Sequence, residues 1–265
     1  MHAQPFLTIV VPTHQRAHLL RRTLQSIKSQ SFTDVQVIVV SDVDDLPTME
    51  ACHALLGPAD TFVKRAGARG PSASRNLALQ LATGRYVMFI DDDDAYQPEA
   101  FVQIHDWLSS HAAEIVFFNC TVVNERRTAG DPVFLSQAPL DLAARYTDDI
   151  FVKNSIHMSC IAFPRHLLSG VEFDPHMRAY EDWDFMLAAM KGARVAHVPI
   201  AATLVHEVHD ETSDRRGAST AAKDFNAVVD YLYVYRRHPA PNPAIQEKRR
   251  QLLLSCKLEV PAYCL

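Results

Sequence analysis

The stretch YVMFIDDDDAYQP, residues 86–98, joins an apolar run to four consecutive aspartates. Adjacent carboxylates repel by about 1 kcal/mol per pair in water and by more in a partly dry cleft, so a nearby cation is expected. An Asp-x-Asp pattern at a strand end offers hard oxygen ligands, which suit Mg²⁺ or Mn²⁺ held jointly with substrate phosphates. The alternative is a solvated acidic turn in which Asp91 or Asp94 caps a helix. The position directly after a buried strand favours the metal interpretation.

Strands and helices alternate around this stretch. Short apolar runs predict strands at 7–11, where Pro12 is expected to end the strand, and at 35–40, 61–64 and 86–90. Apolar residues at helical spacing predict helices around Leu20, Leu24 and Ile27, over 72–81, and from Pro98 through Phe101, Ile104 and Leu108. This order predicts an α/β fold with a mixed, mostly parallel sheet flanked by helices.

Polar clusters follow three of these strands. They are Thr13-His14-Gln15-Arg16, Ser41-Asp42 and the four aspartates. In a parallel sheet, ligands bind at the carboxyl ends of the strands. We therefore expect all three clusters to share one pocket.

The second half of the chain is less regular. Strands are expected at 115–123 and 156–163, joined by a polar connection, and shorter ones at 195–198 and 202–205. A helix should begin with Glu181 and Asp182, and two more should cover 218–237 and 243–258. We predict one domain over 1–215, divided near residue 115, and a helical extension over 216–265.

Composition limits the partners and the compartment. The 265 residues carry a formal net charge of −5, which argues against nucleic acid binding. The five cysteines form no CxxC pair, as is typical of reduced thiols in the cytosol. The N-terminal residues lack a signal-peptide pattern, and no apolar run approaches the roughly 18 residues of a membrane span. We predict a cytoplasmic protein, with docking at the inner face of the membrane left open.

The motif EDWD at 181–184 has two interpretations. Acidic residues stabilise a helix N-terminus whatever the function. The functional interpretation makes Asp182 a general base, because residues 182 and 183 lie about 100° apart on a helix, so that Trp183 can face the core while Asp182 faces a cleft. A carboxylate can accept the proton of an alcohol as the bond to carbon forms.

Together these motifs resemble a known family. VVPTHQR (10–16), VIVVSD (37–42), GPSASRNLALQLATGRYVMFIDDDD (70–94) and EDWDF (181–185) resemble, in this order, the motifs of the family 2 glycosyltransferases of the Rossmann-like GT-A fold. The resemblance covers about residues 6–190. It implies a nucleotide-binding half over about 1–114 and an acceptor half over about 115–215.

The resemblance also implies roles for single residues. The residues expected to border the nucleotide or its diphosphate are Pro12, Thr13, Gln15, Arg16, Asp42 at the base, Arg69, and Asp91 and Asp92 at the ribose. The expected metal ligands are Asp93, Asp91 and His206, and the expected catalytic base is Asp182. His14 and Gln15 replace the family's usual aromatic residue and Asn, and Val43-Asp44-Asp45 follows Asp42 where the family often has Gly-Ser.

The activity implied by the resemblance is an inverting, hexosyltransferase-like sugar transfer assisted by Mn²⁺ or Mg²⁺. The donor would be a nucleotide-diphosphate sugar, with a UDP-sugar favoured, and the acceptor a carbohydrate or a lipid-linked glycan in surface polysaccharide or glycoconjugate synthesis. A catalytically silent protein of the same fold that binds a nucleotide sugar or a carbohydrate is the alternative.

Other classes fit the sequence less well. A phosphatase with an aspartate nucleophile normally has Thr or Val where Ala95 stands, a nucleotidyltransferase needs a glycine-rich first loop, and a dehydrogenase needs GxGxxG after the first strand. The segment 216–265 is compatible with covering the acceptor site, with homodimer formation, with peripheral membrane contact, or with a packed helix that has a solvated basic end.

Overall fold

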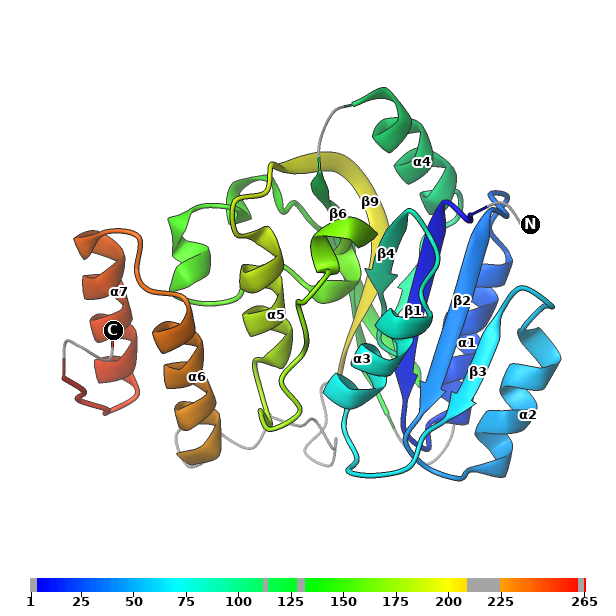
Figure 1. Cartoon of the computed structure of the whole chain (residues 1–265), viewed down its shortest axis with the longest axis horizontal. Coiled ribbons are helices and arrows are strands. Elements are labelled where there is room, and N and C mark those ends of the chain that lie inside the picture. The colour runs from blue at the N-terminus through cyan, green and yellow to red at the C-terminus, as the bar shows by residue number, and fades with distance from the viewer. Residues whose placement is uncertain (1–3, 112–113, 128–131, 209–224, 262–264) are drawn as a thin grey trace.

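The computed structural model describes residues 4–111, 114–127, 132–208, 225–261 and 265, without the side chains of 225–227. Across these residues the strands form one mixed sheet in the order β3-β2-β1-β4-β8-β6-β9-β5, with β7 paired to β6. Helices α3 and α5 lie in front of this sheet in the view of Figure 1, and α1 lies behind it. The predicted α/β class is confirmed.

The first half of the chain supplies the parallel part of the sheet. Its strands are β1 (Leu7–Thr13), β2 (Val35–Ser41), β3 (Thr61–Lys64) and β4 (Tyr86–Phe89). Its helices are α1 (Ala17–Lys28), α2 (Leu46–Leu55), α3 (Pro71–Leu81) and α4 (Ala100–Ser110). Because β1 pairs in parallel with both β2 and β4, the loops after these three strands meet at one edge.

Three details of this half differ from the sequence prediction. Strand β1 continues through Pro12 to Thr13. Proline has no backbone N–H to donate, but β4 pairs with β1 only as far as Val10, so no hydrogen bond between β1 and β4 is lost at Pro12. Helix α4 begins at Ala100, after a left-handed Glu99, and does not include Pro98. Helix α2 was not predicted.

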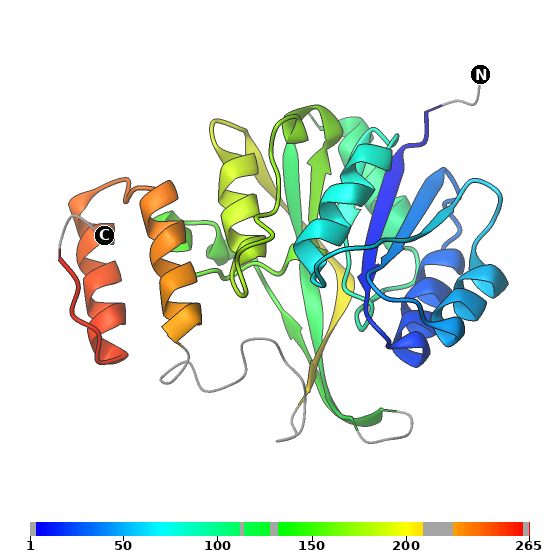
Figure 2. The same ribbon diagram turned by 60° about the horizontal axis from the view of Figure 1, so that its bottom comes forward.

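The remaining strands complete the sheet, and most of their pairings are antiparallel. They are β5 (Ala95–Tyr96), β6 (Ile115–Arg126), β7 (Val133–Leu140), β8 (Ile161–Pro164) and β9 (Val195–Val208). Short 3₁₀ turns connect them: η1 (Ala143–Arg145), η2 (Asp148–Phe151), η3 (Met158–Cys160) and η4 (Arg165–Leu168). Strands β6 and β7 extend as a long ribbon beyond the body of the sheet (Figure 2).

Here too the sequence prediction needs correction. The strand expected at 156–163 begins only at Ile161, because η3 precedes it. The two strands expected at 195–198 and 202–205 are one strand, β9, whose pairing with β6 shifts register around Asn119. The polar connection contains strand β7, which is exposed over nearly its whole length and so has no alternation of buried and exposed residues.

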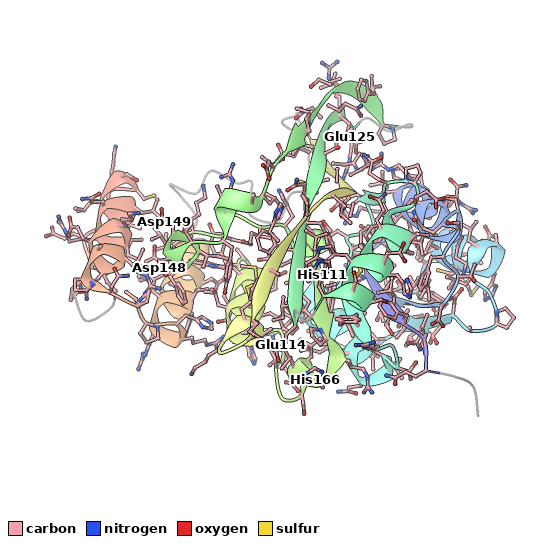
Figure 3. The ribbon with its side chains drawn as sticks, turned by 90° about the horizontal axis from the view of Figure 1, so that it is seen from above. His111, Glu114, Glu125, Asp148, Asp149 and His166 are labelled. Carbon is pink, nitrogen blue, oxygen red and sulfur yellow. The ribbon has the colours of Figure 1, made fainter. Side chains whose placement is uncertain are left out.

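The last helices form a separate layer. Helix α5 (Glu181–Met190) packs against α6 (Phe225–Arg237), and α7 (Pro243–Ser255) lies beside α6 on the side away from the sheet (Figure 1). Asp148 and Asp149 of η2 lie next to α7 (Figure 3), where Asp148 accepts a 2.9 Å hydrogen bond from Asn242. Of the helix expected at 218–237, residues 218–224 lie outside the described part. The domain boundary near 215 stays a prediction.

Among the described residues, none of the helices combines the length and apolar character that crossing a bilayer requires. The described cysteines, Cys52, Cys120, Cys160 and Cys256, are free thiols.

Candidate functional site

The four consecutive aspartates have different surroundings. The side chain of Asp91 is 53% exposed and faces a cleft, whereas that of Asp93 is 19% exposed. Asp92 and Asp94 are buried. The carboxylates therefore point into separate environments, and the repulsion between them is divided among different partners.

Asp92 joins the first strand to the acidic motif. Its carboxylate accepts a 2.7 Å hydrogen bond from the Thr13 hydroxyl at the end of β1, and it is ion-paired with Arg16. Burial raises the pKa of Asp92 to about 6, although Arg16 opposes the shift. Asp92 thus fixes the loop after β1 against the loop after β4, as expected for clusters at one sheet edge.

Asp93 lies among arginines. Its Oδ2 accepts hydrogen bonds from Arg127 Nη1 at 2.7 Å and from Arg16 Nη1 at 3.2 Å. Burial alone would raise the pKa of Asp93, but the two guanidinium groups hold it below its ordinary value. Glu125 of β6, which is labelled in Figure 3, accepts bonds from both Arg127 and Arg22 at 2.8 Å. In this structure the cations that offset the acidic motif are arginines.

Asp94 holds strand β9 and His206 in place. Its Oδ1 accepts the His206 backbone N–H at 2.9 Å, and its Oδ2 accepts the Ser159 hydroxyl at 3.1 Å. Burial raises the pKa of Asp94. The His206 imidazole is buried with no hydrogen-bond partner for Nδ1, and burial lowers the pKa of His206 to about 4. A neutral imidazole with a free ring nitrogen is in the protonation state that metal binding needs.

Asp42 organises the loop after β2. Its Oδ1 contacts His14 Nδ1 at 2.5 Å, and its Oδ2 accepts the Gly70 backbone N–H at 2.7 Å. Burial alone would raise the pKa of Asp42, but these two hydrogen bonds hold it below its ordinary value. The loop that follows β3 is therefore tied to the loops after β1 and β2.

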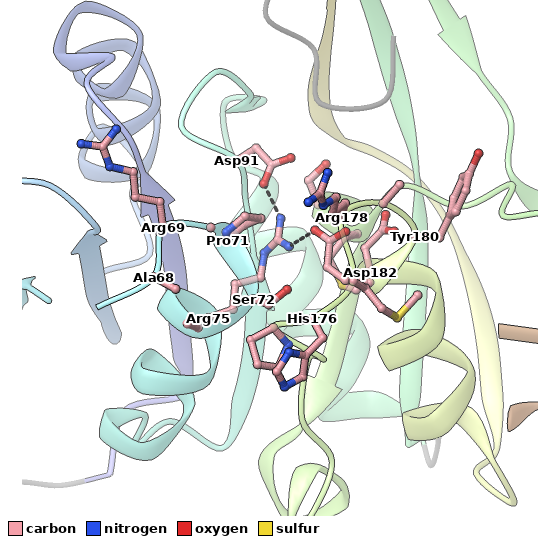
Figure 4. A pocket seen from close by; sticks show the side chains of 18 of the residues that line it. Ala68, Arg69, Pro71, Ser72, Arg75, Asp91, His176, Arg178, Tyr180 and Asp182 are labelled. Atoms are coloured by element: carbon pink, nitrogen blue, oxygen red, sulfur yellow. Dashed lines mark hydrogen bonds and ion pairs between the residues drawn. The ribbon is translucent and has the colours of Figure 1, made fainter. Parts of the chain in front are cut away.

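A cleft of about 1010 Å³ lies between the loops described above and the start of helix α5. At its floor, buried Arg75 of α3 donates to Asp91 at 2.7 Å and to Glu181 at 3.1 Å, as the dashed lines in Figure 4 show. Arg69 and Arg178 also line the cleft. Their side chains are exposed and make no hydrogen bond or ion pair within the described residues.

Asp182 lines the same cleft from the first turn of α5. Its Oδ1 accepts the Trp183 backbone N–H at 2.7 Å, and Asn154 Nδ2 lies 3.4 Å from its Oδ2. Trp183 itself is fully buried and donates from Nε1 to the Ile150 carbonyl at 2.8 Å. Burial raises the pKa of Asp182 even though Arg75 opposes the shift, which makes the carboxylate a better proton acceptor than an exposed aspartate.

These side chains suit a divalent cation only if the substrate supplies further ligands. Asp91 and Asp93 offer hard oxygens, and His206 offers an unpartnered nitrogen. However, no three His, Cys, Asp or Glu side chains in the described ranges are grouped to hold a metal on their own. An ion at Asp93 would need further oxygens from substrate phosphates, as Mg²⁺ sites commonly do, and would compete with Arg16 and Arg127.

The structure places most of the predicted site residues in two groups, and Asp42 lies apart from both, against His14 and Gly70. Asp91, Arg69 and Asp182 line the cleft. The other group lies outside the residues that line the cleft, in or next to the cluster formed by Arg16, Arg22 and Arg127; it consists of Thr13, Arg16, Asp92, Asp93 and His206. Pro12 is buried in β1, and Gln15 is exposed in the left-handed region with φ 52°. These positions leave the roles of the residues as predictions.

Sequence reasoning missed several residues of the site. Arg75 lies within the segment GPSASRNLALQ (70–80), but the pattern of this segment alone indicates no role for it. Arg22, Glu125 and Arg127 were also missed; Arg127 and Asp93 are 34 positions apart, and no local pattern connects them.

Comparison with known proteins gives a consistent set of similarities. A family model described as glycosyl transferase family 2 matches residues 8–163. WcaA of Escherichia coli (strain K12), whose name links it to colanic acid biosynthesis, is 25% identical over 243 residues, which are 90% of this chain and 83% of that protein. TarS of Staphylococcus aureus (strain MW2), named as a poly(ribitol-phosphate) beta-N-acetylglucosaminyltransferase, is 26% identical over 184 residues, 65% of this chain and 32% of TarS.

Solved structures show the same fold. The structure of S. aureus TarS 1–349 in complex with UDP-GlcNAc superposes with a TM-score of 0.69 at 18% identity, covering 94% of this chain and 71% of that one. The mannosyltransferase PcManGT of Pyrobaculum calidifontis, in complex with GDP-Man and Mn²⁺, superposes with a TM-score of 0.57 at 21% identity, covering 98% of this chain and 78% of that one.

Proposed function

Because the chain belongs to glycosyl transferase family 2, we propose that it transfers a sugar from a nucleotide-diphosphate sugar to an acceptor hydroxyl, with inversion at the anomeric carbon. The observation that carries the proposal is that Asp182 and Asp91 face one cleft from opposite walls. A carboxylate of raised pKa on one wall and a strand-end acidic motif on the other suit an acceptor and a donor that meet between them.

The donor would lie along the loops that follow the parallel strands. Asp42 and the Gly70 amide are at the end expected for the base, and Asp91 at the end expected for the ribose. Arg69 and Arg178 are unpaired cations within the described residues, and guanidinium groups bind phosphate oxygens well. Arg16 is paired with Asp92 and Asp93, so it would have to exchange partners to touch a nucleotide.

The chemical step needs one base from the protein. Asp182 takes the proton of the acceptor hydroxyl while the acceptor oxygen forms its bond to the anomeric carbon. The bond from that carbon to the diphosphate oxygen breaks in the same displacement, and its electron pair leaves with the diphosphate. Asn154 and the Trp183 amide hold the carboxylate of Asp182 in place for this transfer.

A divalent ion, Mn²⁺ or Mg²⁺, would be held by Asp93 together with substrate phosphates, and Asp91 and His206 are the further ligands that we propose. When bound, it would neutralise the charge that develops on the leaving diphosphate. PcManGT, which was solved with GDP-Man and Mn²⁺, supports the use of such an ion, and TarS, which was solved with UDP-GlcNAc, supports a nucleotide-sugar donor. The names of WcaA and TarS further support a role in polysaccharide or glycoconjugate synthesis. The acceptor we propose is a glycan or a lipid-linked glycan.

The proposal is tested by thermal unfolding of the purified protein with UDP-, GDP- and dTDP-sugars, each with and without Mn²⁺. A ligand at 100 times its dissociation constant stabilises a protein by about 2.7 kcal/mol, which is readily measured. We expect one nucleotide class to raise the melting temperature, more strongly with Mn²⁺, and the same donor to release its nucleoside diphosphate on turnover. Stabilisation without any turnover would favour the silent binding protein, and no stabilisation by any donor would contradict the proposal.

A further inference from the structure

The segment that precedes Asp182 in the cleft wall, residues 175–180, has no helix or strand to fix its backbone. Residues 175–180 form turns and bends between β8 and α5. The last of them, Tyr180, has φ 62°, in the left-handed region that non-glycine residues seldom adopt, and it makes no side-chain capping bond to α5. Contacts from elsewhere must therefore determine this backbone conformation.

Asp230 of α6 supplies those contacts. Its Oδ2 accepts the Arg178 backbone N–H at 2.7 Å and the Ala179 backbone N–H at 3.1 Å. The side chain is buried, and within the described residues no Lys, Arg or His lies at ion-pair distance from it. Hydrogen bonds to a carboxylate are stronger than those to neutral acceptors, so one buried side chain fixes two successive amides.

Aromatic contacts from the same helix extend this support on either side of Asp182. The ring of Tyr231 packs edge-on against the ring of Tyr180, with the ring centroids 4.8 Å apart, and its centroid lies 5.0 Å from that of the Trp183 ring. Its hydroxyl donates to the Val152 carbonyl at 2.8 Å. Helix α6 thus contacts the residues that directly precede and follow Glu181 and Asp182.

We infer that Asp230 is a positioning residue for the transfer reaction. By holding the amides of Arg178 and Ala179, it fixes the start of α5 and with it the place of Asp182, and it also sets where Arg178 enters the cleft (Figure 4). The C-terminal helices therefore contribute to the chemical step, although α6 places no side chain in the cleft among the described residues. This inference rests on the proposed function, in which Asp182 is the base.

The chain offers a matched control for this role. Asp184 is also buried, and its carboxylate joins α5 to Arg237 at the end of α6 (Nη1, 2.8 Å) and to His238 just after it (Nε2, 2.9 Å). This carboxylate makes no hydrogen bond to residues 175–180, and the only bond from Asp184 to that segment among the described residues is the backbone one from its N–H to the Tyr180 carbonyl at 3.0 Å. Asp184→Ala therefore removes a comparable side-chain link between the helices but keeps the backbone bond to Tyr180 and the bonds of Asp230 to the Arg178 and Ala179 amides. Asp230→Asn keeps an oxygen that can accept both amides, while Asp230→Ala removes it.

The experiment compares these variants of the full chain by hydrogen–deuterium exchange over 175–182 and by steady-state kinetics with the donor found in the nucleotide-sugar screen. For Asp230→Ala we expect faster exchange in this segment and a loss of about tenfold in kcat, with the donor KM within about twofold. Asp230→Asn should also speed exchange over 175–182 and lower kcat, but by less. This variant serves as the test if Asp230→Ala does not fold. Asp184→Ala should leave exchange at 175–182 and kcat near wild type.

Equal losses of kcat in Asp230→Ala and Asp184→Ala, or unchanged exchange at 175–182 in Asp230→Ala, would overturn the inference. If wild-type protein turns over no nucleotide sugar, the proposed function fails, and the exchange comparison alone still decides whether Asp230 holds the segment. If Asp182→Asn is inactive while Asp230→Ala turns over at the wild-type rate, the function stands and the positioning role fails.

Discussion

The Arg127 guanidinium binds the carboxylate of Asp93, with Nη1 2.7 Å from Oδ2, at the oxygen that Arg16 also contacts. A divalent ion at Asp93 has to compete with both arginines for that oxygen. We therefore expect Arg127→Ala to bind Mn²⁺ about tenfold more tightly than the wild type in the presence of the nucleoside diphosphate, because the variant frees the carboxylate and removes a repelling charge. Electron paramagnetic resonance of Mn²⁺ titrated at a fixed concentration of that nucleotide, with the nucleotide alone as the reference, measures this affinity.

The neighbouring Arg126 gives the matched control. Arg126 is exposed at the end of β6 and is not paired with Asp93, so Arg126→Ala should bind Mn²⁺ as the wild type does. Equal Mn²⁺ affinity in Arg127→Ala and wild type would show that the arginine does not compete with a metal at Asp93.

Asp182→Asn should abolish turnover while leaving donor binding intact. Removing a general base typically lowers the rate about 10²–10⁴-fold, and the amide cannot accept the proton. The thermal shift produced by the donor should stay at the wild-type value, because Asp182 is assigned to the acceptor and not to the nucleotide. An Asp182→Asn protein that turned over at the wild-type rate would rule out this residue as the base.

The same residue predicts a pH dependence. Burial raises the pKa of Asp182, with Arg75 opposing and Asp91 reinforcing the shift. Only the ionised carboxylate can act as the base, so kcat/KM should fall as the pH is lowered through this raised pKa. The midpoint of that acidic limb should lie above the ordinary aspartate value of about 4. A rate that stayed constant down to pH 4 in a protein still folded there would contradict the assignment.

The strands that carry the site could be predicted because buried parallel strands are nearly continuous apolar runs, as in Val37–Val40. The missed elements lack such a signal. The buried face of α2 consists of Thr48, Ala51 and Cys52, which are too small or polar to form an apolar stripe, and β7 is exposed over nearly its whole length. The ends of strands were less certain, because pairing with a neighbour decides where a strand such as β1 stops.

The sequence predicted which residues gather at the site but not which partners each of them contacts. Strand-end rules brought Thr13, Asp42 and the four aspartates to one edge, as the structure confirms through Thr13–Asp92. They could not say which aspartate would be buried and which exposed. That difference depends on residues far away in the chain: Arg127, directly after β6, for Asp93, and the β9 backbone for Asp94.

Gly84 is a position where no side chain fits. A Cβ atom there would lie 2.6 Å from the Thr8 backbone nitrogen and 2.7 Å from the Leu7 carbonyl carbon, so the backbone of β1 would have to move. We expect Gly84→Ala to lower the free energy of unfolding by about 1–3 kcal/mol, measured by urea denaturation. Gly57→Ala is the control, because its Cβ would meet only side-chain atoms at 3.6 Å or more. Equal stability of the two variants would contradict this prediction.

Arg249 secures the C-terminal helices against the body of the protein. Its side chain is fully buried, stacks over the Tyr235 ring at 4.1 Å, and donates to the carbonyls of Phe151 at 2.9 Å and His238 at 2.7 Å. Arg249→Met fills part of the space but leaves these buried carbonyls without donors, at a cost of about 3 kcal/mol or more.

The unfolding free energy of Arg249→Met should therefore fall clearly in urea denaturation, with hydrogen exchange increasing first in α6 and α7. Arg250, the next residue, is exposed and pairs with Glu247 on its own helix at 2.7 Å. Arg250→Met should cause no measurable change, because solvent replaces what the side chain loses. If both variants were as stable as the wild type, the buried guanidinium would not be what holds α7 to the rest of the chain.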